Sequence, residues 1–524
     1  MAKKRYLIFF LLFIVLIIDV YLLNLSQFNN NEAAWVLYAK DSLEHKNLPT
    51  HGLAGSLNIY HGLLVVYLFM ALFYIFGCSM NTLGVFYIIL HLLSVYVLFL
   101  VAKKMYNRLV GFLACVFYVS SPIYASFYSL NGDDYSFYFI PLTLIVYSFH
   151  KMLNEKKERY VILLAFSLGV ATQFHSSAYF IIPACLTYLA FNLSVFEKHS
   201  KRNLYIFLSI VIFFGLTARH LYTILIGLDR MRDYILVQGP AFRLLHGNAF
   251  NLLQAFLKSL SITVPVSKYT DIAFFKKFPY IFDPNILMLI LFIFFAPFKS
   301  ISSKFRRNDL LLFTWLSLTL LLFLVSTHYF YYSITPIFGV FAPVIFIGYA
   351  SFIGKVSLHL ERRIIARRLF LTFVCLLIVA NIGGSILCAR SIRRSGGVGW
   401  HRPTRNTRIA IIEYIFSLDS DPNIILVGDE EEAKWSHGPY KFIADTTIAA
   451  RGEKRGLTFY ILEEKSAWYR RSYSKKIEGI IEGIGVMDKK EIGSVTIIIS
   501  EQYRNGAGKA VRISSSRIDV KQFP

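Results

Sequence analysis

One carboxylate, Glu32, is the first candidate for chemistry because it opens a polar stretch soon after a long apolar segment. Apolar side chains follow it at i+3, i+4, i+7 and i+11, which predicts one packed face of a short helix. The asparagines of residues 29–31 supply N-cap side chains, and a carboxylate in the first turn suits the helix dipole. Two interpretations stay open, a structural capping carboxylate and a general base.

Other polar side chains follow apolar segments in the same way. They are Asp133, Asp134, Gln173, His175, His328, Tyr329 and Tyr332. A carboxylate can accept a proton from a hydroxyl, and imidazole or guanidinium groups can hold a phosphate. Glu32 and Asp133 can also share a Mg²⁺ or Mn²⁺ ion, because hard cations prefer oxygen ligands. The structural alternatives are a turn at Asp133, a polar hairpin tip at His175 and an aromatic belt at 328–332.

The composition predicts a membrane protein. Hydrophobic residues make up 56% of the 524 residues and charged residues 17%, whereas soluble domains average about 25% charged residues. Apolar runs close to the bilayer-crossing length of about 20 residues recur as far as residue 389. These runs are continuous rather than alternating, which favours helices over a closed barrel. We therefore predict an all-α polytopic membrane domain for residues 1–389.

The net charge of +23 does not indicate a nucleic-acid partner. Lys and Arg concentrate in short loops between apolar runs, which is the positive-inside pattern of membrane proteins. No zinc-finger spacing, P-loop or basic helix with interleaved aromatic residues accompanies them. Membrane topology therefore explains the charge.

The alternation of apolar runs and basic loops predicts about eleven crossings, with additional interfacial helices and a cytoplasmic N-terminus. With residues 26–58 outside and the basic turn 103–108 inside, only one of the two apolar runs between them can cross. The lysines that follow 82–102 favour that run over 60–79. Asp19, within the first run, is expected near the outer interface because a carboxylate in lipid is costly.

This topology places all the candidate side chains on the outer side of the membrane. A long outer loop, residues 227–283, adds basic side chains that include Arg230 and Arg243. An apolar stripe at residues 250–260 of that loop predicts an interfacial helix. Channels and exchangers more often carry ionisable groups at mid-depth, and this chain carries few there. The pattern indicates a reaction at the membrane surface on an amphiphile with an anionic head.

Residues 390–524 have a different composition, with more charges and glycines and no long apolar run. Residues 408–418 predict an amphipathic helix, and residues 424–427 and 495–499 predict strands. We predict a small extracytoplasmic α/β domain that serves in acceptor binding or as a structural cover.

Several segments, in chain order, resemble motifs of the GT-C membrane glycosyltransferases that use polyprenyl-phosphate sugars, including the protein O-mannosyltransferase and aminoarabinose transferase group. The segments are NNEAAWVLYAKDSL, SLNGDDYSF, GVATQFHSSAYFIIPA and THYFYYSITPIF. The first is similar to the family's first-loop Asp-Glu pair with its amphipathic helix, and the second to its acidic residue after the third crossing. The third is similar to a short hairpin before a proline-ended span, and the fourth to the His/Lys-x-x-Tyr-x-x-x-Pro segment near the donor phosphate.

The resemblance implies that Glu32, Asp133 or Asp134 is the base. The side chains that it implies for the substrate and the donor phosphate are His61, Gln173, His175, Arg230, Arg243, His328, Tyr329 and Tyr332. Two departures matter. Asn31 stands where the family has Asp, and residues 58–61 replace a Lys-Pro-Pro-like segment. His61 then either takes the place of that lysine as a phosphate contact or is a buried structural histidine.

We therefore expect a glycosyltransferase of the cytoplasmic membrane that transfers a sugar from a polyprenyl-phosphate donor to a glycan, lipid or protein acceptor. The expected reaction is an inverting displacement on the extracytoplasmic face, with a carboxylate as general base. The alternative is a lipid or polysaccharide flippase or transporter. Against it, the sequence has no internal repeat and no pair of Gly/Pro-broken spans.

Overall fold

The computed structural model describes most of the apolar part of the chain and pieces of the C-terminal part. The described residues are 6–26, 28, 30–53, 61–121, 137–190, 201–237, 283–295, 303–326, 334–395, 404–418, 422–427, 439–444, 458–463, 488–492, 495–500 and 510–513. The helices are α1 (Tyr6–Leu23), α2 (Asn30–Glu44), α3 (Leu64–Phe76), α4 (Met80–Met105), α5 (Arg108–Ser120), α7 (Phe139–Glu155), α8 (Tyr160–Phe174), the 3₁₀ helix η3 (Ser176–Phe180), α9 (Ile181–Ala190), α10 (Arg202–Val237), α15 (Pro284–Phe295), α16 (Ser303–Ser326), α17 (Ile334–His359), α18 (Ile364–Ser395) and α19 (Arg405–Leu418).

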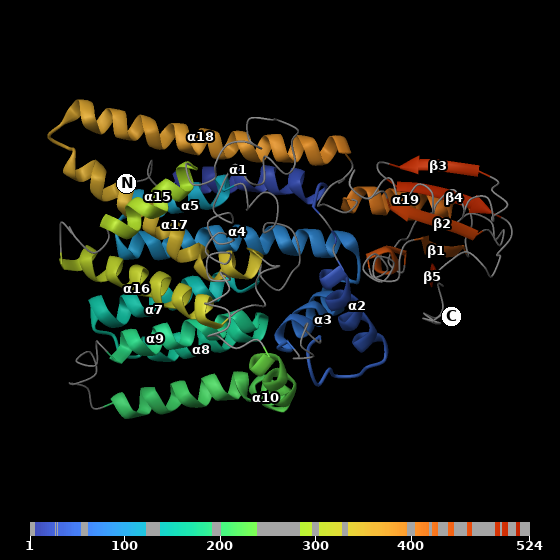
Figure 1. Ribbon diagram of the computed structural model, residues 1–524, viewed down its shortest axis with the longest axis horizontal. Coiled ribbons are helices and arrows are strands. Elements are labelled where there is room, and N and C mark those ends of the chain that lie inside the picture. Colours follow the sequence, from blue (N-terminus) through green and yellow to red (C-terminus); the bar gives the residue numbers. More distant parts are fainter. Residues whose placement is uncertain are drawn as a thin grey trace.

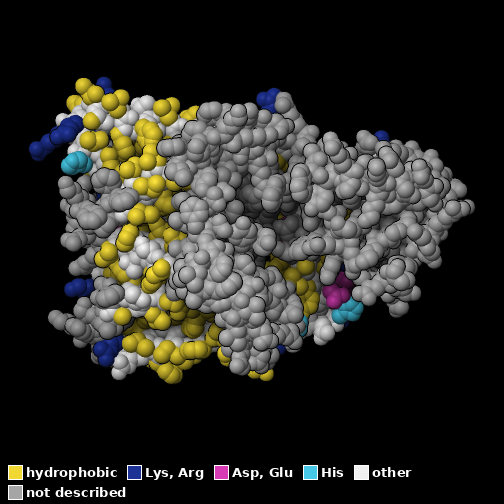
Figure 2. Space-filling view, viewed as in Figure 1, with side chains coloured by type: hydrophobic (Ala, Val, Ile, Leu, Met, Phe, Trp, Pro, Cys, Tyr) yellow, Lys and Arg dark blue, Asp and Glu magenta, His cyan; other side chains and the backbone are white. Residues whose placement is uncertain are grey.

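The long helices lie side by side as one bundle, whose two ends differ (Figure 1). Helices α2 and α3 pack on each other at one end, and α19 with the strands lies beyond it (Figure 1). We call this the α2 end. Lys and Arg side chains gather at the opposite end, where α1 begins, and we call it the basic end (Figure 2). The basic side chains include Lys103, Lys104, Lys156, Lys157, Arg159, Arg362 and Arg363.

The outer surface of the bundle is suited to lipid. Large apolar side chains are exposed along α1, α4, α10 and α18, among them Phe10, Ile89, Phe207 and Leu376. Where described residues are visible between the two ends, most of their side chains are hydrophobic (Figure 2). Among the described residues, four helical stretches are long and apolar enough to cross a bilayer alone, namely Met80–Met105, Arg202–Thr223, Val340–His359 and Ile364–Arg390. The count of about eleven crossings stays a prediction.

The two apolar runs after the first loop form helices of very different length. Helix α3 has 13 residues, about 20 Å at 1.5 Å per residue, which is too short for a hydrocarbon core of about 30 Å. It lies beside α2 at one end of the bundle. Helix α4 has 26 residues and is long enough to cross. By length α4 is the better crossing segment, and the choice of the second run stays a prediction.

Two helices extend beyond the limits that the sequence suggested. Helix α10 continues to Val237, so the first part of the predicted outer loop 227–283 is helical rather than a loop. Helix α18 continues to Ser395, past the predicted domain boundary at residue 389. In both helices the apolar run ends before the helix does. The end of an apolar run does not mark the end of a helix, since a helix can continue with polar side chains. The interfacial helix predicted at 250–260 lies outside the described residues.

Asp19 has a partner inside the protein that the sequence did not suggest, and its predicted place near the outer interface stays a prediction. It is fully buried between α1 and α4, and its Oδ2 lies 2.6 Å from Nδ1 of His91, which is 4% exposed. The ring of Tyr118 from α5 lies 5.6 Å from the His91 ring. A polar pair inside the bundle satisfies two groups that would be costly in lipid. Asp19 therefore links the first helix to the bundle.

A second polar group joins helices at the basic end. The Tyr106 hydroxyl donates to Oδ1 of Asp309 over 2.7 Å, and the Ser351 hydroxyl donates to the same oxygen over 2.9 Å. Lys355 forms an ion pair with the other oxygen of Asp309. Because Asp309 is fully buried and bonded on both oxygens, it ties α16 and α17 to the end of α4.

The C-terminal part contains a mixed five-stranded sheet of order β3-β4-β2-β1-β5. The strands are β1 (Asn423–Val427), β2 (Thr458–Glu463), β3 (Asp488–Ile492), β4 (Val495–Ser500) and β5 (Ala510–Ile513). β1 and β2 are parallel, and the other pairs are antiparallel. Alternate side chains such as Phe459 and Ile461, or Ile497 and Ile499, are buried, as expected for a sheet covered on one face. The apolar side of α19 is buried too, through Ile411, Ile412 and Ile415.

Candidate active site

Glu32 lies in the first turn of α2, and its side chain is buried, with 1% of its surface exposed. Trp35, Val36 and Ala39 are buried on the same face. Asp41 on the opposite face is exposed. The predicted stripe of packed side chains is therefore confirmed, and it directs the carboxylate into the protein rather than toward water.

Two histidines from separate parts of the chain meet beside this helix. The His61 ring lies 5.7 Å from the Trp35 ring and 5.5 Å from the His175 ring. His61 precedes α3, and His175 follows α8. Since Trp35 is one helical turn after Glu32, the three segments that carry Glu32, His61 and His175 come together at the α2 end.

Backbone contacts hold the His61 segment in place. The Gly52 N–H donates to the His61 carbonyl over 3.2 Å, and the His61 N–H donates to the Leu53 carbonyl over 2.8 Å. Oε1 of Gln173 accepts the Leu63 N–H over 3.1 Å. Gln173, which the sequence marked as a substrate contact, thus tethers the start of α3 to the end of α8.

Gly62 is required by this close approach. A Cβ atom at residue 62 would lie 2.3 Å from the Gln173 carbonyl oxygen. We expect Gly62→Ala to lower the free energy of unfolding by about 1–3 kcal/mol, because the backbone must move apart. Gly215→Ala in α10 is the matched control, since a Cβ there meets nothing within 4 Å. Thermal unfolding of both variants in the same detergent measures the difference, and equal midpoints would contradict the close contact.

His175 is held in one neutral form by its neighbours. Its Nδ1 accepts the Ser177 N–H over 3.0 Å and lies 2.7 Å from the Ser177 hydroxyl. Because Nδ1 accepts, the ring proton resides on Nε2, which makes that nitrogen a hydrogen-bond donor. The buried ring of Tyr138 stacks at 6.2 Å from the His175 ring.

A third histidine, His220 from α10, belongs to the same group. It is 3% exposed, and its Nδ1 lies 3.2 Å from the Tyr179 hydroxyl of η3. Electrostatic repulsion from it disfavours the protonated forms of both His61 and His175. The sequence analysis missed His220, although an ionisable residue inside an apolar run is itself a signal.

Burial and mutual repulsion favour uncharged histidines here. Burial, and to a smaller extent the nearby His220, lowers the pKa of His61 to about 4. Burial, His61 and His220 together also lower the pKa of His175 well below its usual value. At neutral pH His61 and His175 are therefore neutral, and each ring offers one nitrogen as donor and the other as acceptor.

The lowered pKa of His61 predicts a loss of stability in acid. The unfolded chain binds the proton near pH 6.5 and the folded chain only near pH 4, so stability is present above pH 6.5 and falls between the two values. For one histidine, the free energy of unfolding changes by at most about 1.4 kcal/mol per pH unit. We expect His61→Gln to flatten the fall in unfolding midpoint over this range. His45→Gln, at an exposed position, should show the same fall in unfolding midpoint as the parent protein. If His61→Gln also shows the same fall as the parent protein, the prediction is contradicted.

The chain that leads into α2 is held by two buried arginines of α19. The Arg405 N–H donates to the Ser26 carbonyl over 2.9 Å, and its guanidinium donates to the Met80 carbonyl. The Arg408 guanidinium donates to the Phe28 carbonyl and lies 5.3 Å from the centre of the Tyr440 ring. Nothing local in the sequence distinguishes these two arginines from the other basic residues around them.

The remaining predicted side chains cannot be placed. Asp133, Asp134, Arg243, His328, Tyr329 and Tyr332 lie outside the described residues, and Arg230 lies in α10 without a described side chain. The chain resumes after Asp134 at Phe137, whose ring stacks 5.5 Å from Phe174, next to His175. Among the described residues, no three His, Cys, Asp or Glu side chains come together as a metal site.

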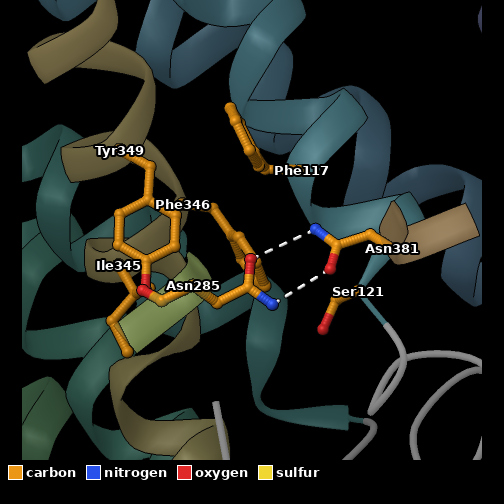
Figure 3. A pocket seen from close by; sticks show the side chains of 7 residues that line it. All are labelled: Phe117, Ser121, Asn285, Ile345, Phe346, Tyr349 and Asn381. Carbon is orange, nitrogen blue, oxygen red and sulfur yellow. Dashed lines mark hydrogen bonds between the residues drawn. The ribbon is translucent and has the colours of Figure 1, made fainter. Parts of the chain in front are cut away.

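A small cavity inside the bundle is separate from the histidine group. It is lined by Phe117, Ser121, Asn285, Ile345, Phe346, Tyr349 and Asn381 (Figure 3). Asn285 and Asn381 exchange two hydrogen bonds of 3.0 and 3.2 Å, and the Tyr349 hydroxyl donates to the Asn285 carbonyl over 2.8 Å. The cavity has room for about one water molecule. It serves helix packing and is too small for a sugar.

Comparison with known proteins gives one matching family and several structures of similar fold. The family described as dolichyl-phosphate-mannose-protein mannosyltransferase matches residues 60–222. The apo structure of ArnT from Cupriavidus metallidurans is similar over 95% of this chain and 98% of that chain, with TM-score 0.52 and 10% identity. Residues 60–222 thus match this family, and the chain has the fold of the ArnT structure. The resemblance and the enzyme class predicted from the sequence are thus confirmed.

Other solved structures of this GT-C group are also similar to the chain. ArnT bound to undecaprenyl phosphate covers 93% of this chain and 96% of its own, with TM-score 0.51 and 9% identity. The Archaeoglobus fulgidus oligosaccharyltransferase AglB, in complex with an inhibitory peptide and a dolichol-phosphate, covers 85% of this chain and 60% of its own, with TM-score 0.46 and 13% identity. No curated protein sequence matches. GT-C enzymes are multi-pass membrane proteins, in agreement with the apolar helices of this chain.

Proposed function

We propose that this GT-C enzyme transfers a sugar from a polyprenyl-phosphate donor to an acceptor hydroxyl at the α2 end of the bundle. The observation that carries the proposal is the buried carboxylate of Glu32, one helical turn before Trp35, whose ring lies next to the pair of neutral histidines His61 and His175. The ArnT structure with undecaprenyl phosphate supports a lipid-linked donor. The basic turns at the opposite end support a cytoplasmic position for that end and an extracytoplasmic reaction.

In the proposed reaction Glu32 acts as general base. The acceptor hydroxyl oxygen attacks the anomeric carbon of the donor, and its proton passes to the Glu32 carboxylate. The bond from that carbon to the phosphate oxygen breaks on the opposite face, so the configuration inverts and polyprenyl phosphate leaves with the bonding electrons. A base in this position contributes about 10²–10⁴-fold to the rate.

The leaving phosphate gains charge during this step and needs donors. His175 presents Nε2–H because its Nδ1 is occupied, and His61 lies against it. Fixed neutral donors can stabilise charge that develops in the transition state without reorganising. Arg230, Arg243, His328, Tyr329 and Tyr332 stay predicted donor contacts.

Two parts of the proposal depend on residues outside the described ones. Asp133 or Asp134 is the second choice for the base. A Mg²⁺ or Mn²⁺ ion held by Glu32 and Asp133 stays a prediction, and no step above passes through it. Removal of metal with EDTA, followed by addition of each ion, tests that prediction.

The experiment that tests the function is donor turnover by the purified full chain in lipid nanodiscs. A panel of labelled polyprenyl-phosphate sugars is offered with a membrane extract as acceptor source. Acceptor-dependent release of polyprenyl phosphate is the expected result. Movement of a lipid or glycan across proteoliposomes without release of polyprenyl phosphate would instead support the transporter, which neither the family match nor the fold favours.

A further inference from the structure

The turn between α17 and α18, at the basic end, carries a surplus of positive charge. Residues 361–368 contain four arginines and a single carboxylate, Glu361. Arg362, Arg363 and Arg368 are exposed, and in the described part of the chain none of the three forms an ion pair. Lys and Arg side chains protrude from this corner of the molecule (Figure 2), where α17 meets α18 in Figure 1. The turn therefore has the charge to bind an anion from outside the protein.

The same turn exposes two isoleucines between the arginines. Ile364 and Ile365 are 63% and 76% exposed, and arginines precede and follow them in the sequence. Apolar surface of this size is unfavourable in water. Arginines beside exposed apolar side chains suit the boundary between lipid headgroups and acyl chains, where each kind of group meets its own surroundings.

An apolar stripe continues from this turn along α18. Ile365, Leu369 and Leu376 are spaced at i, i+4 and i+11, which places them on one face of the helix, and all three are exposed. From Ile365 to Leu376 the stripe is about 16 Å long at 1.5 Å per residue. This length matches half of a hydrocarbon core of about 30 Å. One acyl chain of a single leaflet can therefore lie along the stripe while its headgroup meets the arginines.

Arg367 fixes the start of α18 relative to the end of α17. Its Nε donates to the hydroxyl of Ser357 over 3.2 Å, and Ser357 is buried in α17. The Arg363 N–H donates to the Leu360 carbonyl over 2.9 Å and closes the turn. The exposed arginines thus project from a turn that is already ordered, which lowers the entropic cost of binding a ligand.

We propose that this turn binds the headgroup of an anionic phospholipid in the leaflet that meets the basic end. The guanidinium groups of Arg362, Arg363 and Arg368 hold the phosphate, and an acyl chain lies along the stripe that starts at Ile365. Anionic lipids are typical of the cytoplasmic leaflet, which agrees with the proposed position of this end. The inference does not depend on sugar transfer, because neither Glu32 nor the histidines take part.

The test is native mass spectrometry of the purified full chain with phosphatidylglycerol, and with phosphatidylcholine as the lipid without net charge. We expect Arg362→Gln/Arg363→Gln to weaken binding of phosphatidylglycerol about 30-fold, since each cation near a lipid surface contributes about fivefold. Lys156→Gln/Lys157→Gln is the matched control, because it removes two exposed cations from another turn of the same end. It should change the affinity by about twofold or less. Equal effects of the two double variants, or equal binding of the two lipids by the parent protein, would overturn the proposal.

Changes in the apolar stripe distinguish a lipid from a soluble anion. Ile365→Gln/Leu369→Gln keeps every charge and should weaken binding of phosphatidylglycerol about tenfold, because the acyl chain loses its apolar surface. Ile206→Gln/Ile210→Gln in α10 is the control, with two exposed isoleucines at the same spacing, and it should leave the affinity unchanged. If Ile365→Gln/Leu369→Gln binds as tightly as the parent and inorganic phosphate displaces the lipid, the ligand is a soluble anion and the proposal is wrong.

Discussion

We expect Glu32→Gln to lower the rate of sugar transfer by about 10²–10⁴-fold while the protein still folds. The amide has nearly the shape of the carboxylate but cannot accept the proton of the acceptor hydroxyl. The measurement is release of polyprenyl phosphate at saturating donor, with unfolding midpoints recorded alongside.

Glu44→Gln is the matched control for this variant. Glu44 lies on the same helix, but its side chain is exposed and pairs with Lys40 over 3.2 Å. Its replacement should leave the rate within about twofold, since exposed ion pairs contribute little. Full activity in Glu32→Gln would move the base to Asp133 or Asp134.

The second large effect concerns stability. We expect His91→Leu to lower the free energy of unfolding by about 3–5 kcal/mol, because it removes the partner of the fully buried Asp19. The double change Asp19→Leu/His91→Leu should recover much of this loss, since two apolar groups need no hydrogen bonds.

Ser94→Ala provides the control for this prediction. Ser94 is also buried in α4, one turn from His91, but its hydroxyl bonds only the Leu90 carbonyl of its own helix in the contacts described. Its removal should cost much less. If the double variant is less stable than His91→Leu alone, the prediction is contradicted. The Asp19–His91 pair would then contribute more to the free energy of unfolding than the compensation of one buried charge.

The features that the sequence predicted well are periodic or local. The helical stripe after Glu32 follows from the spacing of its apolar residues, and the choice of 82–102 over 60–79 as the crossing run follows from the lysines at its end. The convergence of the segments of Glu32 and His175 followed from counting which loops share a side of the membrane, whereas His61 was implied by the resemblance. Turn chemistry and charge alternation depend on a few consecutive residues, so they can be recognised in the sequence without a structure.

The features that it did not predict are contacts between distant residues. Asp19 and His91 are 72 positions apart, and Arg405 and Met80 are 325 apart. Considered alone, Asp19 looks energetically costly within an apolar run, and Arg405 looks like any other basic residue. Only the contact with its distant partner explains the position of each side chain. His220 was missed for the same reason, because its helix looked like a simple span until Tyr179 and the other histidines were placed beside it.

The bonds from α19 to the first loop also constrain when the enzyme can become active during its own synthesis. Arg408 and Phe28 are 380 residues apart, and a ribosome that adds about 5–20 residues per second needs about 20–75 s to cover that distance. During that time α1 and α2 have left the ribosome without the arginines that hold the chain between them. Nascent copies of this protein therefore remain catalytically silent until nearly the whole chain is made.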